Sequence, residues 1–244
     1  MRLEPAAVTP PPRARARFWA DLTRYMGKQG PGTRLQRLGV LLRNEPLWAL
    51  ATFRFGQYLR EEASAPVRVL CKLPYALAHR VMELTLGIHL FPQTQVGPGL
   101  YIGHYGGIWV SPHAVLGACC NLNHEATIGC AGEGEEAPQL GDRVWVGPNA
   151  TITGPVKVGH GAVVAANSLV VAHLPENAVA IGVPARVLSY TGSGRLLEPR
   201  SGRVGPGAGP NRVVVEPGVT RDPLRPANTV VEGEGSESSQ GEAR

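Results

Sequence analysis

The sequence predicts a parallel β-helix of triangular cross-section that follows a small α-helical domain. Two observations carry this prediction: aliphatic residues recur every six positions from Leu90 to Val170, and apolar residues upstream recur at the spacing of an α-helix. The chain has 244 residues, 43% of them hydrophobic, which is enough for a substantial core. Its 31 glycines and 22 prolines agree with a fold that turns every few residues.

Residues 17–87 predict a domain of three or four helices, with breaks at 30–32 and 65–66 where glycine and proline cluster. Apolar residues there follow the helical period, as in Leu47, Leu50, Ala51, Phe55 and Tyr58. The last segment, 67–86, carries basic residues beside an apolar face and is expected to be kinked or interrupted at Pro74. It could lie on a membrane surface, but packing on the next domain is the favoured interpretation.

Residues 88–189 predict the β-helix. An aliphatic residue opens each hexad, at Leu90, Val96, Ile102, Val110, Leu116, Leu122, Ile128, Leu140, Val146, Ile152, Val158, Val164 and Val170. Two extra residues stand at 108–109. Glycine often follows the aliphatic residue, and a small residue usually occupies the fourth place beyond it, as in Thr94, Ala114, Cys120, Ala126, Ala150, Ala162 and Ser168. We interpret each hexad as one short strand and one corner, with the aliphatic side chain inside and glycine relieving the backbone at the bend, so that three hexads close a coil.

The two ends of the chain predict disorder. Residues 1–16 are rich in proline and arginine, and residues 190–244 contain glycine, proline, serine and charge with almost no aromatic side chains. A short apolar run at 213–215 is the one candidate docking segment in the tail.

Charge and cysteine content narrow the function classes. The net charge of +5 sits partly in short clusters such as Arg13, Arg15 and Arg17, which disfavours nucleic-acid binding. The four cysteines show neither CxxC spacing nor the density of a secreted scaffold, and the N-terminus lacks an apolar signal segment. A cytoplasmic protein is therefore expected. No segment reads as a membrane span, because charges interrupt 67–86.

Three stretches carry a family resemblance: GPGLYIGHYGGIWVSPHAVLG at 97–117, LGDRVWVGPNATITGPVKVGHGAVVAANSLV at 140–170 and GVPARVL at 182–188. They resemble the serine O-acetyltransferase group of the hexapeptide-repeat transferases, related members of which acetylate sugars of surface polysaccharides. The resemblance implies a left-handed β-helix that forms a homotrimer, or a dimer of trimers, and binds acetyl-CoA in the groove between neighbouring subunits. It implies no metal.

The same resemblance assigns site residues. His104 falls on the catalytic position, where a neutral imidazole takes the proton of the acceptor hydroxyl as that hydroxyl attacks the thioester. Gly147, Ala165 and Ala166 match small residues where backbone amides meet the pantetheine arm. Arg186 matches a basic residue near the phosphates of CoA.

Repeat arithmetic adds a second catalytic candidate. With the insertion at 108–109 included, His124 lies one coil above His104. Counting further coils of eighteen residues reaches Asp142 and His160, so the four residues are expected in one polar column. We take His124 as a catalytic candidate, and Asp142 and His160 as solvent-exposed polar residues.

The sequence also departs from the family at the acceptor side. The family's orienting aspartate, fifteen residues before the catalytic histidine, is replaced by His89, and the Arg-His-Pro that holds the amino acid is replaced by Glu136-Ala137-Pro138. With Glu133 and Glu135 nearby, this loop would repel the carboxylate of serine but could accept hydrogen bonds from sugar hydroxyls. We therefore expect a sugar or glycan acceptor, with Glu136 and His89 as substrate-binding residues and serine as the alternative acceptor.

Two other function classes remain open at this point. A metal-dependent hydratase of the carbonic-anhydrase type on the same β-helix would need three converging histidines, for which His104, His124 and His160 are the candidates. A catalytically silent trimeric scaffold is the other alternative.

Overall fold

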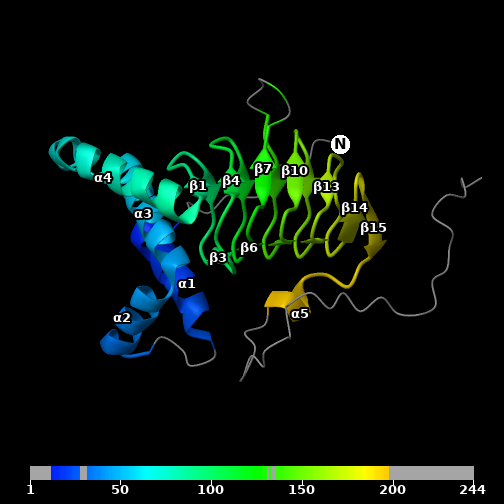
Figure 1. Cartoon of the computed structure of the whole chain (residues 1–244), viewed down its shortest axis with the longest axis horizontal. Helices are drawn as coiled ribbons and strands as arrows, with labels where there is room; N and C mark the ends of the chain where they lie inside the picture. Colours follow the sequence, from blue (N-terminus) through cyan, green and yellow to red (C-terminus); the bar gives the residue numbers. More distant parts are fainter. Residues whose placement is uncertain (1–11, 28–31, 131, 133–135, 198–244) are drawn as a thin grey trace, which may run out of the picture. The chain divides into compact units, whose positions relative to one another are not determined.

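The computed structural model describes residues 12–27, 32–130, 132 and 136–197. Figure 1 shows helices packed at one end of a stack of short strands. The helices before the stack are α1 (Ala14–Met26), α2 (Arg34–Arg43), α3 (Glu45–Glu61) and α4 (Ala65–Leu86). Helix α1 begins three residues before the boundary expected at residue 17, because its first N–H, on Ala14, donates to Glu62 Oε1 at 2.6 Å and Arg17 pairs with Glu61. Both are long-range contacts that local periodicity does not reveal.

The strands form three sheets that run the length of the stack (Figure 1). The first sheet contains β1 (Ile88–Leu90), β4 (Ile108–Val110), β7 (Thr127–Gly129), β10 (Thr151–Thr153) and β13 (Leu169–Val170). The second contains β2 (Gln95–Val96), β5 (Val115–Leu116), β8 (Gln139–Leu140) and β11 (Lys157–Val158). The third contains β3 (Tyr101–Ile102), β6 (Asn121–Leu122), β9 (Trp145–Val146), β12 (Val163–Val164), β14 (Val179–Gly182) and β15 (Ala185–Ser189). All pairs are parallel except β14 with β15, which confirms the parallel β-helix.

The interior of the stack contains the residues that the hexad pattern placed there. Each of the thirteen aliphatic residues that open a hexad is at most 4% exposed, and the seven small residues at the fourth place are at most 2% exposed. Stacked aliphatic side chains therefore form one continuous core, which also includes Leu47, Leu50 and Phe53 from α3.

The hexad glycines are required for a reason other than the one expected. A Cβ on Gly117 would lie 2.6 Å from the backbone N of Asp142, and one on Gly147 would lie 2.6 Å from the backbone N of Ala166. These glycines allow close approach of adjacent coils. The left-handed turn conformation occurs elsewhere in the corner, for example at Asn149 and Asn167, whose side chains hydrogen-bond to each other at 2.8 Å.

Helices α1 and α3 cover the first coil through buried polar side chains. Arg54 donates to the carbonyls of Val96 and Gly97, at 2.8 and 2.7 Å, and Asp21 Oδ1 accepts the N–H of Leu100 at 2.8 Å. The hydroxyl of Tyr25 bonds both the carbonyl and the N–H of Ile102 at 3.0 Å. Burial raises the pKa of Tyr25, so its hydroxyl stays neutral and can donate. These contacts satisfy backbone groups that would otherwise be left unpaired at the open end of the stack.

Helix α4 runs from Ala65 to Leu86 as one element with Pro74 inside it, so of the two expectations, a kink or an interruption, the interruption is wrong. Proline removes one N–H from the helix, and the carbonyl that loses its partner belongs to Leu70, a residue that is 78% exposed and can be hydrated. The helix ends at Gly87, which has a φ of 60°. Within the described part of the chain, no helix is both long and apolar enough to cross a membrane.

Residues 190–197 are ordered on the stack, which corrects the expectation that the tail is disordered from residue 190. Ser193 is 1% exposed and donates its hydroxyl to the carbonyl of Arg143 at 2.6 Å. The short helix α5 (Gly194–Leu197) packs Leu196 and Leu197 against Trp145, Val163 and Val179. Two leucines are enough to dock the segment, because the outer face of β9, β12 and β14 is apolar. The predicted docking run at 213–215 lies outside the described residues.

Candidate active site

His104 and His124 stand one above the other at one corner of the stack. Each follows its strand by two residues, and the strands β3 and β6 are hydrogen-bonded neighbours with Ile102 opposite Leu122. The two imidazole rings meet edge to face, with their centroids 5.9 Å apart. His104 is exposed and His124 is partly buried. The structure confirms that His124 lies one coil above His104.

Asp142 and His160 do not belong to this column, so the expected run of four polar residues is wrong. Strand β9 pairs with β6 through Val146 and Leu122, which places Pro148 above His124. Asp142 and His160 instead follow β8 and β11 in a different sheet. The loop between β7 and β8 adds one hexad, so a count of eighteen residues per coil moves to the wrong corner at that point.

The second corner has its own polar contacts. His160 Nδ1 accepts the backbone N–H of Asp142 at 2.9 Å, and His173 Nδ1 accepts that of Lys157 at 2.9 Å. Each imidazole thus satisfies a backbone N–H of this corner through its Nδ1. They line an open cavity of about 650 Å³ with Lys157 and Glu176 on the face of β8 and β11. His104 and His124 do not line it.

His89 is held by a carboxylate from α4. Its Nδ1 lies 3.4 Å from Glu83 Oε1, and the Nδ1 of His79 lies 3.6 Å from the same oxygen. Arg80 contacts the other oxygen of Glu83 at 3.3 Å. Sequence reasoning missed Glu83, because the helix brings it to β1 across the Gly87 turn rather than through the repeat.

The cofactor candidates share the corner of His104. Ala166 follows β12 by two residues and so lies in the column of His104 and His124, with Pro148 between. The N–H of Gly147 donates to the carbonyl of Val164, and that of Ala165 donates to the carbonyl of Ala180, both at 2.8 Å. These two amides are therefore occupied within the fold, whereas no hydrogen bond from the N–H of Ala166 is found among the described residues.

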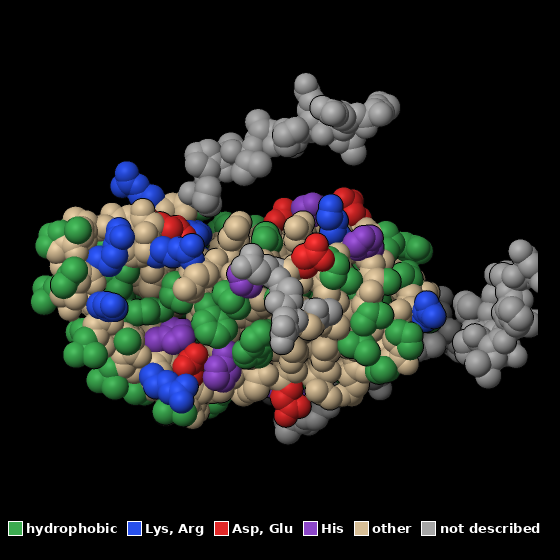
Figure 2. Space-filling model, turned by 90° about the horizontal axis from the view of Figure 1, so that it is seen from above, with side chains coloured by type: hydrophobic (Ala, Val, Ile, Leu, Met, Phe, Trp, Pro, Cys, Tyr) green, Lys and Arg blue, Asp and Glu red, His purple; other side chains and the backbone are tan. Residues whose placement is uncertain are grey.

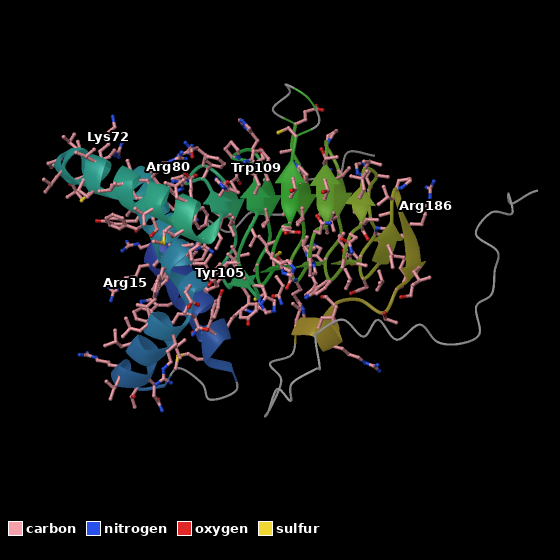
Figure 3. All side chains as sticks on the ribbon, in the orientation of Figure 1. Arg15, Lys72, Arg80, Tyr105, Trp109 and Arg186 are labelled. Carbon is pink, nitrogen blue, oxygen red and sulfur yellow. The ribbon has the colours of Figure 1, made fainter. Side chains whose placement is uncertain are left out.

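Arg186 lies at the far end of the stack from the first coil, on β15, as Figure 3 shows in relation to Tyr105, the neighbour of His104. Five strand spacings separate β3 from β15 in their sheet, or about 24 Å along the stack. An extended ligand could reach both.

The other acceptor candidate, Glu136, lies in a loop segment rather than in a helix or strand. Glu136 is exposed at the start of the segment that enters β8, and Ala137 beside it is 8% exposed. Glu133 and Glu135 lie outside the described residues.

The three histidines considered for a metal occupy two corners and do not converge within one chain. Among the described residues no group of three or more His, Cys, Asp or Glu side chains could hold a metal ion.

Comparison with known proteins shows what this chain is similar to. Residues 137–172 match the family described as bacterial transferase hexapeptide (six repeats). Serine acetyltransferase 4 of Arabidopsis thaliana is 35% identical over 120 residues, which is 48% of this chain and 34% of that protein. The serine acetyltransferase of Mycobacterium tuberculosis is 33% identical over 120 residues, which is 47% and 52% of the two chains. The chain thus spans about a third to a half of the length of these relatives.

Solved structures agree with the sequence comparison. A crystal structure of Neisseria gonorrhoeae serine acetyltransferase in complex with serine superposes with a TM-score of 0.60 and 26% identity, covering 72% of this chain and 69% of the other. This chain contains a hexapeptide repeat and is similar to the serine acetyltransferases. The resemblance inferred from the motifs around His104 is therefore confirmed.

The same comparisons correct the expected acceptor. The relatives of this hexapeptide-repeat protein are named as serine acetyltransferases, and one of the superposed structures contains serine. The expectation of a sugar acceptor is wrong on this finding. It rested on the charge of one loop, whereas the similarity extends over about half of the chain.

Proposed function

We propose that this hexapeptide-repeat protein is a serine O-acetyltransferase that uses acetyl-CoA as acyl donor and His104 as general base. The observation that carries the proposal is the placement of His104. It is exposed at a corner of the stack, in the column that contains His124 and Ala166, whose N–H makes no hydrogen bond to the part of the chain that the structure describes. A base for a hydroxyl must be accessible to its substrate, and an amide donor nearby suits the amide groups of a pantetheine arm.

The reaction needs one proton acceptor and no covalent enzyme intermediate. The imidazole of His104 takes the proton of the serine hydroxyl as the oxygen forms a bond to the thioester carbonyl carbon. The carbon–sulfur bond then breaks, and the proton passes from His104 to the leaving sulfur, which gives O-acetylserine and the free thiol of CoA. Neutral imidazole is the competent form, because only an unprotonated ring nitrogen can take the proton of the hydroxyl.

A trimer completes the proposed site. Within the described residues the imidazole of His104 contacts the ring of His124 and makes no hydrogen bond or ion pair. An orienting group would then come from a neighbouring subunit, and acetyl-CoA would lie along the groove between subunits with Arg186 near its phosphates. His89 is held by Glu83 in this chain and is proposed to act at the acceptor side of the same groove.

The test is an assay of the purified chain with acetyl-CoA and L-serine. CoA thiol release is followed with a thiol reagent, and O-acetylserine is identified by mass spectrometry. L-Alanine, which lacks the hydroxyl, is the matched control substrate. Serine-dependent thiol release with formation of O-acetylserine supports the proposal, and thiol release that is equal with alanine or absent with serine overturns it.

A further inference from the structure

An apolar stripe runs along α4 on the side away from the rest of the molecule. Leu70, Leu73, Leu77, Val81 and Leu84 follow one another at spacings of three and four residues, so they share one face of the helix. Four of these side chains, the leucines, are 66–79% exposed, and Val81 is 40% exposed. We call these five residues the α4 stripe.

The packing of α4 uses the opposite face, so the stripe is not a core surface. The residues of α4 that are partly or fully covered include Cys71, Tyr75, His79, Met82 and Leu86, also at spacings of three and four. Tyr75 contacts Phe55 on α3, and His79 bonds the carbonyl of Leu90 at 2.9 Å. The two sets lie half a turn apart around the helix. We expected the apolar face of this segment to pack on the next domain. In the structure the next domain contacts the opposite face of α4, and the apolar face is exposed.

The charge of the helical region is strongly positive. Residues 12–87 contain thirteen Lys and Arg against five Asp and Glu, whereas residues 88–189 contain three against six. In Figure 2 the Lys and Arg side chains gather over the helices, at the left of that view. Basic charge is therefore concentrated in the part of the molecule that carries the α4 stripe.

The exposed charges of α4 itself are all basic. Arg68, Lys72 and Arg80 are exposed, and Figure 3 labels Lys72 and Arg80 along the helix. The one acidic residue of α4, Glu83, is only 10% exposed and contacts Arg80, His79 and His89. Of the three basic residues, Arg80 lies beside the stripe, whereas Arg68 and Lys72 lie toward the face of Cys71, Tyr75 and His79. An exposed apolar helix face in a strongly basic region is the form that binds in the interface of an anionic membrane.

We propose that α4 binds the surface of anionic lipid bilayers, lying in the plane of the interface with the α4 stripe inserted among the lipids. Burial of the leucines in the acyl boundary supplies the apolar contribution, and Arg80 beside the stripe, together with the basic charge of the helical region, attracts the negatively charged headgroups. A second copy of the chain is a less suitable occupant, since pairing two such faces brings basic side chains of the same sign together. This inference is independent of the acceptor and of the catalytic residues.

Vesicle sedimentation tests the proposal directly. The full chain is mixed with vesicles of phosphatidylcholine alone, or of phosphatidylcholine with a quarter phosphatidylglycerol, and the bound fraction is measured after centrifugation. We expect binding at least tenfold stronger to the anionic vesicles, and weaker at high salt because the charge contribution is screened. Equal affinity for both vesicle types, or none for either, overturns the proposal.

Matched variants test whether vesicle binding depends on the α4 stripe or is non-specific adhesion of the protein. The pair Leu70→Glu and Leu77→Glu is expected to reduce binding to anionic vesicles at least tenfold. Val171→Glu, which changes a 53% exposed aliphatic residue of the β-helix, is the control and should leave binding unchanged. Circular dichroism and thermal unfolding check that each variant folds. Binding that survives in the Leu70→Glu/Leu77→Glu variant overturns the proposal, as does loss of binding in the Val171→Glu control.

Sedimentation velocity distinguishes a second copy from lipid. If the stripe instead joined copies of this chain, the assembly would halve in mass when Leu70 and Leu77 are replaced, without any affinity of the parent protein for vesicles. That outcome would reject lipid binding. An unchanged mass together with loss of vesicle binding supports it.

Discussion

Arg54 of α3 and Asp21 of α1 form a two-point ion pair in which both side chains are almost completely buried. Arg54 Nε lies 2.7 Å from Asp21 Oδ2, and a terminal nitrogen lies 3.1 Å from Oδ1, while the side chains are 2% and 0% exposed. The same two groups bond the backbone at Val96, Gly97 and Leu100, so the pair joins two helices to the first coil.

Removal of one partner of this pair should destabilise the protein strongly. Asp21→Asn leaves Arg54 as a buried charge without a counter-ion, and we expect a loss of about 3–5 kcal/mol in the free energy of unfolding. Denaturant titration measures it. The double variant Asp21→Asn/Arg54→Met should lose less than the sum of the two single variants, because it leaves no unpaired charge. Additive losses would show that the two residues act separately.

His104 should be required for turnover but not for folding. His104→Ala is expected to lower kcat by about 10²–10⁴-fold, the range for loss of a general base, with an unchanged melting temperature because the side chain is exposed. His124→Ala should have a smaller effect on kcat, since we assign the proton transfer to His104. Parallel steady-state kinetics and thermal unfolding separate the two effects. Comparable kcat in the His104→Ala variant would transfer the role of base to His124.

Glu136→Arg should improve the use of serine. The resemblance to the serine O-acetyltransferases implies an arginine at this position to hold the substrate carboxylate, and Glu136 is exposed, so its replacement should not disturb the core. We expect a KM for L-serine lowered several-fold, with kcat changed much less. Glu125→Arg, another exposed glutamate, is the control. An unchanged KM in the Glu136→Arg variant would place carboxylate recognition elsewhere.

Cys119 and Cys120 should differ sharply in reactivity although they are adjacent. Cys120 points into the core and burial raises its pKa to about 12, so almost no thiolate is present at pH 8. Cys119 is exposed. Iodoacetamide on the native protein should label Cys119 and spare Cys120, while denaturant should open both, as peptide mass spectrometry can show. Fast native labelling of Cys120 would mean that the coil opens locally.

The docked segment 190–197 should stabilise the stack through its two leucines. Leu196→Ala combined with Leu197→Ala is expected to lower the melting temperature, by about 2–4 °C for each kcal/mol lost in a chain of this size. Arg195→Ala, in the same turn but exposed, is the control and should have no effect. A melting temperature that does not respond to the leucines would mean that the contact with Trp145 and Val163 contributes little.

The interior of this protein could be predicted from sequence because each inward position repeats the same local requirement. Every aliphatic residue that opens a hexad is buried, and His124 was placed correctly above His104, since only two extra residues intervene there. The same count failed at Asp142, because the length of the loop before β8 cannot reveal whether it adds a whole hexad. The repeat predicts where each short strand lies along the chain, whereas the hydrogen bonds between strands determine which residues stack in one column.

Contacts made by the helices could not be predicted in this way. Glu83 reaches His89, and Arg54 reaches the carbonyls of Val96 and Gly97, across large separations in sequence and without any repeat to relate them. The ordered structure of residues 190–197 was also not predicted. Amino-acid composition gives the apolar content of a segment, but it does not reveal the apolar surface on which the segment packs.

The antiparallel pairing of β15 with β14 gives the molecule a defined end. A stack of parallel rungs exposes at its last coil a row of unpaired amide and carbonyl groups, which is a template for end-to-end association into fibres. Strand β15 runs antiparallel to β14 and forms the last strand of the third sheet. The exposed edge of that sheet therefore does not match the first strand of a parallel stack in another molecule. At the opposite end Arg54 and Asp21 bond backbone groups of Val96, Gly97 and Leu100, so both ends of the stack carry contacts that oppose end-to-end association.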